Sequence, residues 1–309
     1  MSIELNPGMF GWNSDAAPAA FAAYSHLFSP LAIRAEPPKD MPPIWQWSKA
    51  LNGGKHLPTW NQLRGDCVSM GAHCAIEYCE AARIGAQHLA EKFKLIFPPW
   101  IYGTSRHQIG QDELGHSTIR DDSNDGSTGA WAVAAMAKYG LLSVDDPGVP
   151  AYDAQVVVDW GNAGPPKQFF DVAKPRLLKK FTKLTTVDEI RAALKSYRPV
   201  TFAIDWYYDP NTVQTVKGYR CVKRGRKLGG HQVCLIHWND EINAALHQNS
   251  WSEDAFKGPA PLDEPPGSAY ILTADLEKDL RGRNVEAYAI DVFDSDPAES
   301  WYGLFGSGS

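Results

Sequence analysis

Residues 65–72 have the sequence Gly65-Asp66-Cys67-Val68-Ser69-Met70-Gly71-Ala72, which places a cysteine at the expected start of a helix. A thiol in the first turn lies near the positive end of the helix dipole and near free backbone N–H groups. Together with a cationic histidine, this position can lower a cysteine pKa from about 8.5 to roughly 3.5–7.5. We therefore expect Cys67 to be a nucleophile that is a thiolate at neutral pH. Taken alone, a cysteine is more often a small buried apolar residue, an interpretation that suits Cys74 and Cys79.

Two later stretches supply partners for this thiol. Gly229-Gly230-His231 opens an expected strand, and Gln248-Asn249-Ser250-Trp251 ends another. The imidazole of His231 can exchange a proton with the thiol, and the neutral amide of Asn249 can orient the ring and fix its tautomer. Each residue alone also fits a hairpin or a turn. The complete set of thiol, imidazole and amide favours acyl transfer through a thioester.

An amide pair precedes the cysteine and could stabilise the oxyanion of such a reaction. Gln62 or Asn61 would donate beside the backbone N–H of Cys67, and losing one such donor typically costs about 10²–10³ in rate. The sequence leaves both residues as candidates, and a plain turn before the helix is the ordinary interpretation.

The composition excludes several other classes of protein. The chain has 309 residues, of which 44% are hydrophobic and 21% charged, and its net charge of −6 disfavours a general nucleic-acid binder. It contains no apolar run of the roughly 20 residues that span a bilayer. The first residues lack a basic region followed by an apolar one, so no secretory signal is visible. We expect a protein without nucleic-acid or membrane partners, either cytoplasmic or virion-associated.

The cysteine count and spacing argue against disulfides and metal sites. Five cysteines form an odd set, and the chain has neither a Cys-x-x-Cys nor a His-Glu-x-x-His motif. A disulfide framework or a zinc site therefore has little support. We expect neither a metal nor another cofactor.

The order of the elements predicts an α+β fold. Helices are expected over 16–27, 67–84 and 127–139, and a capping box at Thr186 and Glu189 opens another that ends near residue 196. Strands are expected over 199–206, 231–238, 244–249, 268–273 and 285–293. We predict an extended surface arm over residues 1–42, a domain over 43–295 and a flexible tail over 296–309.

The order of these motifs resembles that of the papain-like cysteine peptidases, with the bacterial and viral branch most similar. The resemblance covers roughly residues 42–295 and includes Asp125-Gly126-Ser127 before a helix. It implies two lobes, a helical one over about 60–160 and a β-barrel-like one over about 165–295, with the active-site cleft between them. It also implies a cysteine endopeptidase that acts on peptide or protein substrates through Cys67, His231, Asn249 and Gln62.

Some features depart from that family and keep two other functions open. Gln62 lies five residues before Cys67, where the family usually has six, and the 1–42 arm is shorter than a typical inhibitory propeptide. One alternative is a papain-like scaffold in a larger assembly, such as a virion, that holds its assembly partner through residues 1–42. Another is an acyltransferase with the same thioester chemistry, although such enzymes usually have Asp where this chain has Asn249.

Overall fold

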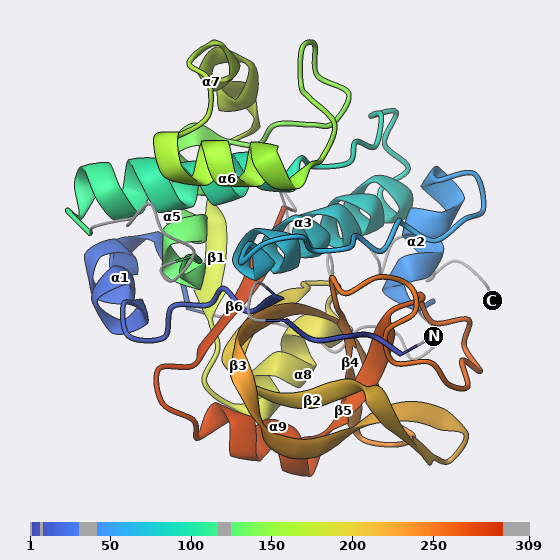
Figure 1. The fold of residues 1–309 in the computed structure, drawn as a ribbon. Helices are drawn as coiled ribbons and strands as arrows, with labels where there is room; N and C mark the ends of the chain where they lie inside the picture. Colours follow the sequence, from blue (N-terminus) through green and yellow to red (C-terminus); the bar gives the residue numbers. More distant parts are fainter. Residues whose placement is uncertain (1, 7–8, 31–41, 117–124, 293–309) are drawn as a thin grey trace.

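The structure is a computed structural model that describes residues 2–6, 9–30, 42–116 and 125–292. The chain forms two lobes, one of packed helices and one built around a curled sheet (Figure 1). The N-terminal segment runs along the boundary between them, below α3 and above β2 and β3 in that view. The expected tail 296–309 lies outside the described residues. No described helix has the length and apolar character needed to cross a bilayer.

The helical lobe is built around a buried central helix, α3 (Cys67–Ala86). Its residues are small or apolar on nearly every side, and a helix of that kind is stable only when it is surrounded by other elements. The other helical elements are α1 (Ala17–Tyr24), α2 (Ile44–Leu51), α4 (Pro98–Gly103), a π-helix (Thr104–Glu113), α5 (Gly129–Tyr139), α6 (Ala154–Ala163) and α7 (Gln168–Ala173). Short 3₁₀ turns at Ser25–Leu27 and Lys174–Arg176 follow α1 and α7.

The second lobe is a six-stranded sheet that closes partly on itself. Its strands are β1 (Lys180–Lys183), β2 (Val200–Val216), β3 (Tyr219–Asn239), β4 (Ala244–Gln248), β5 (Ser268–Leu272) and β6 (Glu286–Asp291), in the order β1-β6-β2-β3-β4-β5. Strand β3 also pairs with β5, through Cys221 and Tyr270, which curls the sheet into a half-barrel. Helices α8 (Val187–Lys195) and α9 (Thr273–Leu280) pack against it.

The two lobes meet where α3 lies against β3. A Cβ on Gly71 would come within 3.0 Å of the Gln232 side chain and 3.1 Å of the Val233 carbonyl oxygen, so the glycine permits the close approach. The Gln232 amide donates to the Val68 carbonyl at 2.8 Å. This contact fixes the position of the N-terminal turn of α3 against the middle of β3.

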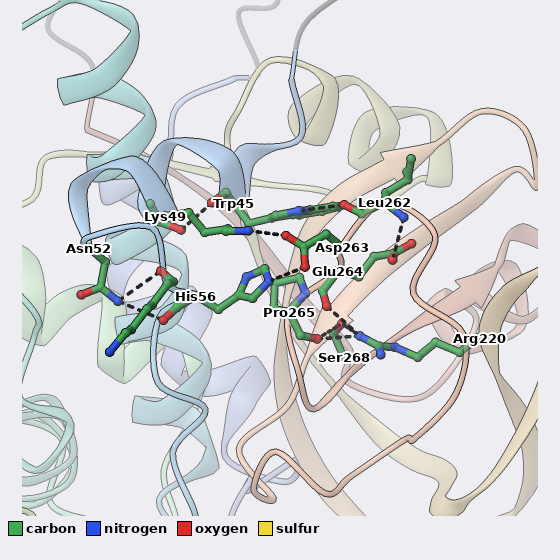
Figure 2. A network of polar contacts seen from close by, with 12 residues as sticks. Trp45, Lys49, Asn52, His56, Arg220, Leu262, Asp263, Glu264, Pro265 and Ser268 are labelled. Atoms are coloured by element: carbon green, nitrogen blue, oxygen red, sulfur yellow. Dashed lines mark hydrogen bonds and ion pairs between the residues drawn. The ribbon is translucent and has the colours of Figure 1, made fainter.

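A polar network holds α2 against the β lobe (Figure 2). Lys49 forms an ion pair with Asp263, and His56 approaches the same carboxylate at 3.3 Å. The buried Arg220 donates to the Glu264 and Pro265 carbonyls at 3.1 and 2.6 Å. The guanidinium therefore orders the proline-rich loop that α2 contacts.

The expected α+β architecture is confirmed, with differences in extent. Strands β2 and β3 are longer than expected because they pair with each other as one long hairpin. The capping box is present, since Glu189 N–H donates to Thr186 Oγ1 at 3.1 Å and the Glu189 carboxylate accepts from Thr186 N–H at 3.0 Å. The sequence analysis missed β1, the π-helix, and α2, α4, α6, α7 and α9, which have short or irregular apolar patterns.

Replacing Thr186 by Ala is expected to lower the free energy of unfolding by about 1 kcal/mol, because an N-cap hydroxyl of α8 is lost. Urea unfolding followed by circular dichroism measures the change. Thr186→Ser keeps the hydroxyl and serves as the matched control. Equal stabilities for the Ala and Ser variants would show that the cap contributes nothing.

Candidate active site

Cys67 is the first residue of α3, as the sequence predicts, and it is completely buried. The backbone N–H groups of Gly11 and Gln232 lie against its sulfur and favour the thiolate. Asp66 and Asp125 lie near enough to oppose ionisation. These N–H groups belong to the N-terminal segment and to β3 rather than to the start of α3, and two carboxylates counteract them.

The structure brings His231 and Asn249 together. His231 Nε2 lies 3.0 Å from Asn249 Oδ1, which also accepts the Ser250 N–H at 2.6 Å. Because that oxygen is an acceptor, Nε2 carries the proton of the neutral ring, which leaves Nδ1 as the basic nitrogen. Nδ1 is buried, and the Met9 backbone lies close enough to the ring to favour its protonated form.

Aromatic rings enclose the imidazole. The Trp251 ring stacks on His231 with centroids 4.4 Å apart, and the Trp206 ring meets it edge-on at 5.1 Å. These rings shield the His231–Asn249 hydrogen bond from water. Trp206 contributes to the same enclosure from β2, and its position depends on the pairing of Ile204 with His231 across the hairpin.

Of the two amide candidates for the oxyanion, Gln62 is buried and Asn61 is exposed. The Gln62 side chain donates to the Arg64 carbonyl at 2.6 Å and accepts from Ser250 Oγ at 2.9 Å. It is thus anchored between the loop before Cys67 and the residue after Asn249. This placement favours Gln62 over Asn61 as the donor and leaves one amide hydrogen for a ligand.

The N-terminal arm crosses the site instead of lying on a surface. Gly11 O accepts from Ser127 N at 2.8 Å, and Trp12 N donates to Gly230 O at 3.1 Å. Phe10 lies against the rings of His231 and Trp251. The interpretation of residues 1–42 as a surface arm is therefore wrong for residues 9–12, whose apolar side chains and central glycine fit the space between the lobes.

Gly11 does not present its own carbonyl to the thiol. The Gly11 N–H faces the Cys67 sulfur, while the Gly11 carbonyl points to Ser127 N. A Cβ on Gly11 would lie only 1.7 Å from the Gly65 carbonyl oxygen, so the backbones of arm and loop are in direct contact. Gly11 therefore covers the Cys67 thiol with its N–H group and turns its carbonyl away from the sulfur.

Burial sets the protonation of the pair in this closed arrangement. It raises the pKa of the Cys67 thiol to about 12, and it lowers the pKa of His231 to about 4 despite the Asn249 hydrogen bond. Both groups are neutral at pH 7, which differs from the expected thiolate. The reason is that both groups are fully buried, beneath the arm and the surrounding elements, and desolvation disfavours both charged forms.

Asp66 is a titratable residue of the site that the sequence analysis did not single out. It is fully buried, and Tyr152 donates to its Oδ2 at 3.1 Å. Burial raises the pKa of Asp66 to about 7, and the nearby Asp125 adds to that rise. Asp125 itself accepts from Gly65 N at 2.8 Å, so the loop before the cysteine is held between two carboxyl groups.

Replacing Gly11 by Ala is expected to expose Cys67, because the added methyl group clashes with Gly65. The rate of alkylation of Cys67 by iodoacetamide, followed by peptide mapping, measures the exposure. Gly225→Ala adds a methyl group where the nearest heavy atom is 3.5 Å away and is the matched control. Unchanged labelling in the Gly11 variant would contradict the contact between arm and loop.

Asp66 makes the stability of the protein depend on pH with a defined sign. Its folded pKa of about 7 lies above the ordinary aspartate pKa of 3.8, so the native state binds the proton more tightly than the unfolded state. Its contribution is present below about pH 4 and is lost as pH rises to about 7, by up to about 1.4 kcal/mol per pH unit. We expect the Asp66→Asn variant to show no such loss of unfolding free energy. The difference in unfolding free energy between wild type and variant, measured from pH 4 to 8, should change across that window and be flat above it.

Comparisons with known proteins give a likeness at the level of structure. No protein-family model matches the chain, and no curated protein matches its sequence. The fold is similar to that of xylellain, a cysteine protease from Xylella fastidiosa, with 16% identity, a TM-score of 0.59, and coverage of 94% of this chain and 98% of that one. It is also similar to procathepsin B S9 from Trypanosoma congolense, with 13% identity, a TM-score of 0.54, and coverage of 92% and 86%. The chain therefore has the papain-like two-lobed α+β fold.

Proposed function

We propose that the chain is a cysteine endopeptidase that hydrolyses peptide bonds through a thioester on Cys67. The observation that carries the proposal is the arrangement of His231, whose Nε2 is held by Asn249 so that Nδ1 is the basic nitrogen of the neutral ring. A ring held in that way is prepared to take a proton from a thiol. The cleft also holds an extended stretch of peptide backbone, which supports peptide or protein chains as substrates.

The reaction follows from the roles of these groups. His231 Nδ1 takes the thiol proton, and the Cys67 thiolate adds to the substrate carbonyl carbon. The backbone N–H of Cys67 and the Gln62 amide bind the resulting oxyanion. His231 then gives its proton to the leaving amine, the C–N bond breaks, and a thioester remains. Water, deprotonated by His231, hydrolyses the thioester and restores the thiol.

The arm must leave the cleft before any substrate can bind. Its departure would also rehydrate Cys67 and His231, and the loss of desolvation lowers the pKa of a thiol and raises that of an imidazole. Both changes bring the two groups closer to the thiolate–imidazolium pair that the reaction needs. Departure of the arm would therefore both admit the substrate and favour the charged pair, while its presence opposes both.

A second candidate is a papain-like scaffold that binds a partner within a larger assembly and hydrolyses little or nothing. The observation that favours it is the complete burial of Cys67 and His231 under residues 9–12. In that case residues 1–42 would be the segment that the assembly partner engages. The two candidates differ in whether the thiol is needed.

Casein hydrolysis by the Gly11→Ala chain tests the proposal, because this variant opens the cleft. We expect Cys67→Ala in that background to abolish hydrolysis, and Gln62→Ala to lower the rate by about 10²–10³.

Asn249→Ala should lower kcat and shift the acid limb of the pH profile, since the ring loses the partner that orients it. Hydrolysis that persists without Cys67 would refute the peptidase. A labelled but inactive Gly11→Ala chain would favour the scaffold.

A further inference from the structure

Trp12 occupies a well-defined space in the cleft. Its indole N–H donates to Glu286 Oε2 at 2.7 Å, its backbone N–H donates to Gly230 O, and its backbone runs beside Ser127. We call this space the Trp12 pocket, defined by Ser127, Gly230 and Glu286. The side chain of Trp12 is 5% exposed and that of Glu286 is 3% exposed, so the contact is buried.

The protein body holds the Glu286 carboxylate in a fixed orientation. Oε1 accepts from Ala130 N–H and Tyr288 O–H, each at 2.9 Å, and Oε2 accepts from Gly129 N–H at 2.8 Å. Two of these donors belong to the first turn of α5, whose dipole also favours a negative charge. Only the fourth donor, the indole of Trp12, comes from the arm. The carboxylate is thus an acceptor that is fixed in advance of the arm's arrival.

The backbone contacts of the arm are independent of its sequence. Ser127 and Gly230 bind main-chain groups of residues 11–13, which any extended peptide other than one with proline there could supply. Selection among peptides therefore depends on the pocket. A Cβ on Gly230 would lie 2.5 Å from the Trp12 carbonyl oxygen, so this strand residue lets the peptide approach closely.

The indole lies within the hydrophobic core of the described residues. Trp12 belongs to the buried cluster that also contains Cys67, Ala130 and Tyr288. An indole matches such a space, because it has a large apolar body and one N–H donor. A phenyl ring would leave the Glu286 oxygen without its donor, and a guanidinium would bring five donors to a single open acceptor position.

We propose that the Trp12 pocket is the side-chain recognition pocket of the cleft and that Glu286 makes it selective for tryptophan. When the arm leaves, a tryptophan of the substrate takes the place of Trp12 and donates to the same oxygen. This inference rests on the proposed peptidase in one respect only, namely that the incoming peptide is then cleaved.

The test uses the full chain with Trp12→Ala, which removes the arm's own indole. This substitution is expected to raise the alkylation rate of Cys67 by iodoacetamide by about 10- to 100-fold, the effect of one hydrogen bond to a charged group. The buried Cys74 and Cys79 are internal controls for general unfolding. No gain in labelling would overturn the proposal, because the arm would then be held without the pocket.

Two capped peptides with the sequence of residues 9–13 then compete with alkylation of the Trp12→Ala chain. One contains tryptophan, and the other contains benzothienylalanine, in which sulfur replaces the ring N–H and the shape is kept. We expect the tryptophan peptide to protect Cys67 at an about 10- to 100-fold lower concentration. A further Glu286→Gln substitution should abolish the difference. Equal protection by both peptides would overturn the proposal even if the Glu286 variant fails to fold.

The labelling assay needs an accessible thiol but no hydrolysis, so it separates the two hypotheses. Tryptophan-dependent protection without peptide cleavage would refute the peptidase and retain the pocket. Cleavage of peptides at equal kcat/KM for tryptophan and benzothienylalanine would refute the pocket and retain the peptidase.

Discussion

The contact between Gln232 and Val68 is the constraint on which the site depends. Each of these residues is the chain neighbour of a proposed catalytic residue, Gln232 of His231 and Val68 of Cys67. The hydrogen bond between them, together with the close approach at Gly71, holds the first turn of α3 against the middle of β3. The proposed nucleophile and the proposed base lie on different lobes, so this buried interface sets the position of one relative to the other.

The N-terminal arm also contacts both lobes where they meet. Its Gly11 backbone lies on the loop before Cys67, and Trp12 lies on β3 and β6, so one short segment contacts both lobes. Because the segment removes water from the site, it changes the chemistry as well as the access. The nearby carboxyl group of Asp66 gives a second influence on the thiol, since its ionisation near pH 7 would oppose that of Cys67.

The sequence predicts the elements that depend on local signals. The cysteine at a helix start and the capping box at Thr186 are each visible in a few adjacent residues, and the structure places them as expected. His231, which the sequence predicts at the opening of a strand, lies instead within the longer β3. The path of the arm could not be predicted in the same way, because it depends on contacts between residues far apart in the chain. The Gly11–Gly65 approach and the Trp12–Glu286 hydrogen bond are of this kind. A glycine between two aromatic residues near the N-terminus was the only local signal.

The thiol pKa was mispredicted for a related reason. A helix N-terminus favours a thiolate when water or a cation is also present, and local sequence cannot show whether a distant segment excludes that water. In the closed site, the N–H groups of Gly11 and Gln232 favour ionisation, but the cost of desolvation is larger. An apolar segment that binds across the nucleophile therefore suppresses its charge even when it supplies a hydrogen bond. Under the proposed function, removal of the segment would return water to Cys67 and so favour its ionisation.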